Sequence, residues 1–291
     1  MIQHDRVAES VYSFQSDMYA QVTAGVIAGP EWAVVIDTLP FPEETLEIRD
    51  FVEQELHVPV RYVIDTHYHA DHTWGNCLFP GSLVISSALC RQMLDTRGRA
   101  ALESARRQNS SMFRQIKIVL PHLTFHSGTL GMRVGKKTLT LLNLPGHSAD
   151  SIGVLVEEDR VLFAGDSFMP IPVIVDGDLE ETIETLKLIG KIGLENVIQG
   201  HGDIILRGEV DEQIKSNITY LNSIRRAVRK ASRRKYAWDI LELEDVESCG
   251  KSRVLIGGLA EELHRQNLRS LYQKTFGEFP ASSNEDHQTR G

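Results

Sequence analysis

The sequence has 291 residues, of which 42% are hydrophobic and 24% charged, as is ordinary for a globular protein with a substantial core. Its formal net charge of -9 argues against attraction of the whole protein to nucleic acid or to an anionic membrane, although it leaves a local basic patch open. No apolar stretch approaches the ~20 residues that span a bilayer. The N-terminal residues also lack the basic-then-apolar order of a secretory signal.

Cysteine usage points to a reducing compartment. Cys77, Cys90 and Cys249 are too few and too scattered for a disulfide framework. We therefore expect a cytoplasmic protein. The net charge and the lack of a long apolar stretch further lead us to expect a small-molecule substrate, with no membrane contact and no nucleic-acid partner.

The N-terminal half of the chain alternates strand-like runs with helical segments. Short β-like runs fill the first forty residues, and Pro42 followed by two glutamates predicts a helix that reaches about Leu56. The runs RYVIDTH (61–67) and LVISS (83–87) predict strands, and residues 88–118 are predicted to be helical.

Short strands return after Pro121, and three helices are predicted beyond them. Asp178 and Glu181 have the spacing of a capping box and predict the start of the first helix. Apolar residues at helical spacing predict a long helix from Glu209, and a last helix is expected over 254–276.

These elements suggest three parts: a metal-binding domain over 1–205, a helical extension packed on it over 206–276, and a disordered polar tail over 277–291. Because strands and helices alternate in two batches, the expected fold class is α/β, with helices on both faces of sheets.

The strongest chemical signal is a cluster of histidines directly after an apolar strand. His67, His69, Asp71 and His72 place four metal-ligand side chains within six residues. On a strand, His67 and His69 project to the same side. Imidazole nitrogens and carboxylate oxygens suit zinc, and also iron or manganese.

Three more sites repeat one pattern, in which an apolar strand and a glycine precede a single ligand-type residue. These residues are His147, Asp166 and His201. A glycine at the exit of a strand permits a sharp turn, so the side chain near it can point into a shared cleft.

Taken in order, HYHADH (67–72), PGHS (145–148), AGDS (164–167) and GHGD (200–203) resemble the metal-binding motifs of the metallo-β-lactamase superfamily. The resemblance covers roughly residues 10–205 and implies a four-layer αβ/βα sandwich, here with extra C-terminal helices. It also implies two divalent metal ions, with zinc expected first and iron or manganese as alternatives. The first ion would bind His67, His69 and His147, the second Asp71, His72 and His201, and Asp166 would bridge the two.

The chemistry implied by this resemblance is hydrolysis. A hydroxide between two cations would attack a carbonyl–heteroatom bond in a thioester, ester, lactone or lactam. Asp71 is the expected catalytic residue, because it could orient the nucleophile and carry its proton.

Within the superfamily, the complete set of five histidines and two aspartates looks more like the glyoxalase II and lactonase types than like true β-lactamases. A phosphodiesterase or nuclease with the same dimetal core is the alternative. A non-hydrolytic redox protein that binds iron is a second alternative.

Several other features admit both a functional and a structural interpretation. The basic segment 225–235 could bind an anionic ligand, or it could be the solvated end of a long helix. The apolar loop 168–173 could line an acyl pocket or be buried by packing. Tyr68, Cys77, His122 and His126 are expected to be structural or surface residues, whereas Trp74 and Asn76 could shape the pocket wall. The substrate itself is expected to be chosen by residues 88–126 and by the helices beyond 205, which could also form a homodimer surface.

Overall fold

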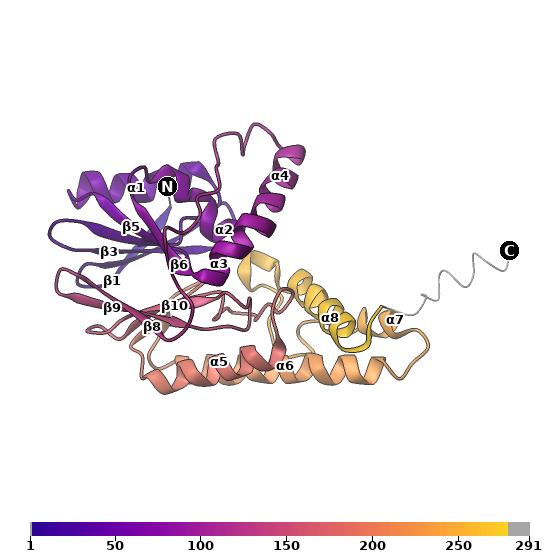
Figure 1. Ribbon diagram of the computed structural model, residues 1–291. Coiled ribbons are helices and arrows are strands. Elements are labelled where there is room, and N and C mark those ends of the chain that lie inside the picture. The colour runs from indigo at the N-terminus through magenta and orange to yellow at the C-terminus, as the bar shows by residue number, and fades with distance from the viewer. Residues whose placement is uncertain (1, 279–291) are drawn as a thin grey trace.

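The computed structural model describes residues 2–278, which form two facing β-sheets with helices on the two outer faces (Figure 1). Helix α1 lies on the outer side of the first sheet, and α5 and α6 lie on the outer side of the second. The predicted α/β class and four-layer αβ/βα sandwich are confirmed, and helices follow the last strand as expected. From residue 279 on, the tail that was predicted to be disordered lies outside the described residues.

The first sheet has seven strands in sequence order. Its first four strands pair antiparallel, and the pairs β4–β5, β5–β6 and β6–β7 are parallel. The strands are β1 (Gln3–Ala8), β2 (Val11–Gln15), β3 (Thr23–Ala28), β4 (Ala33–Ile36), β5 (Val60–Ile64), β6 (Leu83–Ser87) and β7 (Leu123–Phe125).

The second sheet has six strands in the order β13-β12-β11-β10-β9-β8, in which only β11 and β12 pair in parallel. The strands are β8 (Thr129–Val134), β9 (Lys137–Asn143), β10 (Ile152–Val156), β11 (Val161–Gly165), β12 (Asn196–Gln199) and β13 (Ile205–Leu206).

The helices connect the strands and close the two outer faces. The α-helices are α1 (Pro42–Asp50), α2 (Ala70–Thr73), α3 (Ala88–Met93), α4 (Arg99–Gln108), α5 (Leu179–Ile192), α6 (Val210–Ala231), α7 (Ala237–Leu241) and α8 (Ala260–Phe276). Short π-helical turns follow α1 (Phe51–Glu55, η1) and α3 (Leu94–Gly98, η3), and 3-10 turns follow α2 (Trp74–Leu78, η2) and precede α8 (Ile256–Gly258, η4).

Apolar side chains from both sheets form the central core. Ile64 and Ile85 of the first sheet belong to one buried cluster with Leu141, Val154 and Phe163 of the second. Burial of such side chains removes apolar surface from water and contributes roughly 1.5–3 kcal/mol each. This core holds the two sheets face to face, so that the loops at their shared edge meet.

Backbone hydrogen bonds join the sheets at that edge. The amide of Thr23 donates to the carbonyl oxygen of Gly200 at 2.9 Å, and the amide of Ile152 donates to the carbonyl oxygen of Thr66 at 2.8 Å. The motif loops after β5 and β12 are therefore tied to the opposite sheet.

The predicted helix over 88–118 is wrong beyond Gln108, where α4 ends. Residues after it run without regular structure, and the Arg106 guanidinium donates to the carbonyl oxygens of Phe113 and Ile116. Ile116 is fully buried next to Trp74 and Leu102. Tertiary burial of this segment thus outweighs the helical tendency of its neighbours.

Helix α5 begins as predicted. The side chain of Asp178 accepts hydrogen bonds from the amides of Glu180 and Glu181, which satisfies two free donors of the first turn. Among residues 2–278, no helix combines the length and the apolar character that a membrane span requires.

Candidate metal centre

All seven predicted ligand residues lie at the edge where the two sheets meet. His67 and His69 follow β5, and Asp71 and His72 lie in the short helix α2. The other three side chains follow strands of the second sheet: His147 comes after β9, Asp166 directly after β11, and His201 after β12. The seven side chains form two groups whose ligand atoms lie within 4.8 Å of one another inside each group.

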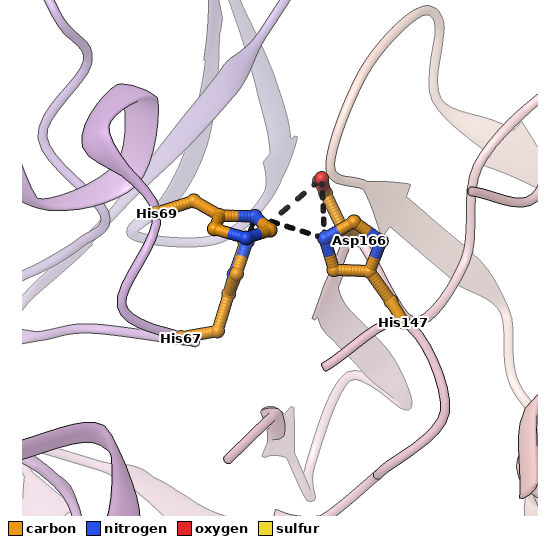
Figure 2. A group of neighbouring side chains, drawn as sticks. All are labelled: His67, His69, His147 and Asp166. Atoms are coloured by element: carbon orange, nitrogen blue, oxygen red, sulfur yellow. Dashed lines mark hydrogen bonds and ion pairs between the residues drawn. The ribbon is translucent and has the colours of Figure 1, made fainter. Parts of the chain in front are cut away.

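The first group consists of His67, His69, His147 and Asp166, whose side chains are turned toward one another in Figure 2. Nδ1 of His69 lies 2.9 Å from Nε2 of His67 and 3.0 Å from Nε2 of His147. Oδ2 of Asp166 is 3.3 Å from Nε2 of His147 and 3.9 Å from Nε2 of His67.

The second group consists of Asp71, His72 and His201. Oδ2 of Asp71 lies 3.4 Å from Nε2 of His201 and 3.9 Å from Nε2 of His72. The other oxygen of Asp166, Oδ1, lies 3.2 Å from Nε2 of His72 and 3.5 Å from Nε2 of His201. The carboxylate of Asp166 therefore presents one oxygen to each group.

Hydrogen bonds on the far side of the rings fix which nitrogens face the centre. Nδ1 of His147 lies 2.9 Å from the carbonyl oxygen of Val173, and Nδ1 of His201 lies 2.9 Å from that of Ala20. A carbonyl oxygen can only accept, so each Nδ1 donates its hydrogen and the Nε2 of each ring is left to bind a proton or a cation at the centre.

Lone pairs that converge in this way need a cation or a proton between them. The buried Nε2 of His72 and the buried Oδ1 of Asp166 have no hydrogen-bond partner among the described residues. Burying such polar atoms away from water costs free energy unless a cation or a proton binds to them. The donor set of imidazole nitrogen and carboxylate oxygen fits a divalent metal ion.

Burial and charge set the protonation of these groups. Burial lowers the pKa of His67 well below its usual range and lowers that of His147 to about 4. For His201, burial also lowers the pKa, but the charges of Asp166 and Asp71 outweigh it and raise the pKa to about 10. Burial would raise the pKa of Asp166, yet the nearby imidazoles, His201 first, hold it well below its usual value. Asp166 is therefore a carboxylate ringed by nitrogen ligands.

Asp37 is a buried residue that the sequence patterns did not single out. Its Oδ2 accepts from Nδ1 of His72 at 2.8 Å and from the hydroxyl of Thr66 at 2.8 Å, and its Oδ1 accepts from the amide of Thr66. Oγ1 of Thr66 is in turn 3.0 Å from Nδ1 of His67. One carboxylate thus orients a histidine of each group.

Asp176 is the second residue that the sequence patterns missed. Its Oδ2 lies 3.3 Å from Nε2 of His69 and accepts a hydrogen bond from the hydroxyl of Tyr68. Its Oδ1 lies 3.4 Å from the guanidinium of Arg97. The ring of Tyr68 is buried with Cys90, so the structural interpretation of Tyr68 agrees with its position.

A cavity of about 610 Å³ opens over both groups. One wall is the loop after β11, and another is the segment that leads from η4 into α8. The lining residues are Tyr19, Ala20, His69, Asp71, His147, Asp166, Met169, Val173, Val175, Asp176, His201, Ile256, Leu259, Glu262, Leu263 and Gln266.

The remaining candidates lie away from this cavity. Trp74 packs against Phe113, and Asn76 donates to Asp65 at 3.0 Å. His126 is exposed, and Nδ1 of His122 accepts from the amide of Val84 at 3.0 Å. Cys77 belongs to the apolar cluster around Trp74.

The two segments with open interpretations lie in different places. Of the loop 168–173, Met169 and Val173 line the cavity, whereas Phe168 and Ile171 are buried. The basic segment covers the last turns of α6 and the turn that follows this helix. Its cations line a separate hollow formed by Arg226, Arg229, Lys230, Arg233 and Arg234.

Comparison with known proteins places the chain in a family. The sequence model of the metallo-beta-lactamase superfamily matches residues 19–229 of this chain, so the chain belongs to this superfamily. It is 26% identical over 160 residues to the beta-lactamase-like protein 2 homolog of Caenorhabditis elegans, covering 54% of this chain and 48% of that protein. It is 28% identical over 172 residues to the lactamase-like protein aptB of Emericella nidulans, covering 58% of this chain and 48% of that protein. The chain thus spans about half the length of the curated relatives it matches.

Solved structures share the fold. A metallo-beta-lactamase from Pontibacter korlensis superposes with a TM-score of 0.58 at 20% identity, covering 74% of this chain and 98% of that one. A metallo-beta-lactamase from Hirschia baltica gives a TM-score of 0.56 at 18% identity, covering 74% of this chain and 96% of that one. These structures show the fold alone, whereas the match to the family model confirms the predicted superfamily. The His/Asp groups suit a divalent metal centre.

Proposed function

We propose that the chain is a metal-dependent hydrolase that cleaves a carbonyl–heteroatom bond in a thioester, ester, lactone or lactam. The observation that carries this proposal is the position of Asp166, whose two oxygens face two separate groups of nitrogen and oxygen ligands. Superfamily membership supports it. We assign one divalent cation to His67, His69 and His147 and a second to Asp71, His72 and His201, with Asp166 shared, and we expect zinc ahead of iron or manganese.

Two divalent cations bound to these residues would supply Lewis acidity and lower the pKa of water, so that hydroxide forms near neutral pH. The chain's own residues would supply position and proton transfer. The rings of His147 and His201 are held by backbone carbonyls, and the ring of His72 is held by Asp37. Such fixed ligands need little reorganisation during a reaction.

We assign proton transfer to Asp71. Its carboxylate lines the cavity and its Oδ2 lies 3.4 Å from Nε2 of His201, so it reaches both the ligand set and a substrate. An Asp71→Asn variant should lose most turnover. A variant that keeps the metal content and the full turnover of the wild type would contradict this role.

The test of the proposed function joins metal content to activity. Elemental analysis of the full chain should find about two metal ions. A panel of a glutathione thioester, a lactone, simple esters, a chromogenic cephalosporin and a phosphodiester is then assayed before and after chelation. Cleavage of a carbonyl substrate that is lost on chelation and in His67→Ala supports the proposal. Cleavage of the phosphodiester alone, or iron with oxygen uptake and no hydrolysis, would replace it with the corresponding alternative.

We further propose a reducing, cytoplasmic location. The three cysteines are all free, and two of them are buried. Free buried thiols are typical of proteins that fold where disulfides are rare.

A further inference from the structure

One face of α8 forms a wall of the cavity above the candidate metal centre. Leu259, Glu262, Leu263 and Gln266 all line this cavity. Their spacing of three, four and seven residues places them on the same side of a helix. The C-terminal helix therefore meets any substrate that reaches the His/Asp groups.

The charges on the cavity wall are all negative once the candidate ligands are set aside. The charged lining residues are then Asp176 and Glu262, and no lysine or arginine of residues 2–278 lines the cavity. Asp176 has partners in Tyr68 and Arg97. Apart from Tyr19 and Gln266, the remaining wall is apolar, with Met169, Val173, Leu259 and Leu263 among its members.

Glu262 has no cationic partner in the described part of the chain. Its side chain is exposed, and the hydrogen bond it receives comes from the neutral amide of Gln266 at 3.3 Å. By contrast, Glu261 one residue earlier is within 3.4 Å of Arg265. A carboxylate that is neither buried nor paired repels an anion brought close to it and attracts a cation, and low ionic strength strengthens both effects.

We propose that Glu262 makes this cavity select carbonyl substrates whose non-reacting end is an apolar chain, neutral or with an ammonium group, and disfavour substrates that carry a carboxylate or phosphate there. The inference rests on the proposed hydrolase function and names the substrate class of the same site. It places glutathione thioesters and phosphodiesters, both anionic, among the poor substrates. It also assigns the selection to the helical extension and not to the motif loops.

Binding tests this selection independently of turnover. Three methyl ketones of equal chain length, ending in a methyl, an ammonium or a carboxylate group, offer a carbonyl without a leaving group. Calorimetry on the metal-loaded full chain should show that the carboxylate ketone binds roughly threefold more weakly than the other two. Glu262→Gln should remove most of this difference in affinity, and Glu262→Lys should reverse it. The same order is expected in kcat/KM for the matching esters.

The control is Glu103→Lys, which makes the same change at an exposed site on α4 that does not line the cavity. It should leave the order of the three ketones unchanged. Equal or tighter binding of the carboxylate ketone by the wild type would overturn the proposal, as would an order that Glu262→Lys leaves intact. If the wild type hydrolyses no ester but the ketones bind in the expected order, the proposed reaction fails while the charge selection stands.

Discussion

Asp37 does not line the cavity above the candidate metal centre, yet it contacts candidate ligands of both groups, either directly or through Thr66. No sequence motif marks it. It accepts from His72 directly and reaches His67 through Thr66. Its backbone has a φ of 57°, in the left-handed region, which asparagine and aspartate tolerate better than most residues. Its position after β4 carries no histidine motif, so local sequence gave no reason to select it.

An Asp37→Asn variant should therefore bind metal about 10- to 100-fold more weakly, the range measured when carboxylates behind ligand histidines are replaced. Asparagine keeps the shape and tolerates the backbone conformation, but it removes the negative charge that favours the orientation of His72. Competition with a chromogenic chelator measures the affinity. Asp50→Asn, at the exposed end of α1, is the control and should bind metal like the wild type. Equal affinity in both variants would show that Asp37 does not support the ligands.

At the scale of elements, the turn after β12 needs glycine because it passes against Asp166. A Cβ at position 200 would lie 1.9 Å from Oδ1 and 2.7 Å from the backbone nitrogen of Asp166. Neither atom can move without disturbing the shared carboxylate.

A Gly200→Ala variant should lose metal from at least one group and be destabilised by roughly 1–3 kcal/mol, as is typical of overpacked sites. Thermal unfolding and elemental analysis measure the two effects. Gly208→Ala is the matched control, because a Cβ there would meet no heavy atom within 4 Å. If both variants keep the wild-type metal content, the close approach at Gly200 is not what holds Asp166 in place.

Helix α8 also holds the loop that forms the opposite part of the cavity. The side-chain nitrogen Nδ2 of Asn267 donates to the backbone carbonyl oxygen of Pro172 at 2.7 Å. Oδ1 of Asn267 accepts from the backbone amide of Ile174 at 2.9 Å. Between these two residues lies Val173, which lines the cavity and accepts from Nδ1 of His147.

Replacing Asn267 by alanine should leave the carbonyl of Pro172 and the amide of Ile174 buried without a hydrogen-bond partner. This loss should destabilise the protein by about 2–4 kcal/mol. We expect a lower melting temperature and a higher KM, since the loop would no longer be held against the cavity. Gln273→Ala, an exposed change on the same helix, should alter neither quantity. A melting temperature unchanged in Asn267→Ala would mean that α8 does not position the loop.

At the scale of the whole molecule, the helical extension shares its core with the second sheet. One buried cluster contains Leu162 of β11 and Leu144 directly after β9, together with Tyr220 of α6 and Leu268 of α8. The cluster is continuous, so buried contacts join residues 1–205 to the extension over 206–276.

A chain that ends at residue 205 should therefore fail to fold as a soluble protein. Each large apolar side chain that is uncovered costs roughly 1.5–3 kcal/mol, and a few such losses exceed the 5–15 kcal/mol by which most domains are stable. The yield of soluble protein and the cooperativity of thermal unfolding measure this loss of folding. Co-expression of residues 206–276 should restore part of the soluble yield. A soluble, cooperatively unfolding 1–205 fragment would show that the extension is an independent addition.

The sequence by itself determined the α/β class, the superfamily and the set of side chains that converge at the sheet edge. Each of these depends on local patterns: the alternation of strand-like and helical segments, and ligand-type residues that directly follow apolar strands. Only the tertiary structure decided which side chains support the centre and which face the substrate. Asp37 and Thr66 are 29 residues apart, and Asp176 and His69 are 107 apart, so no local pattern marks these pairs. The end of α4 and the cavity wall formed by Glu262 likewise depend on burial and on contacts between distant segments, which only the folded chain brings together.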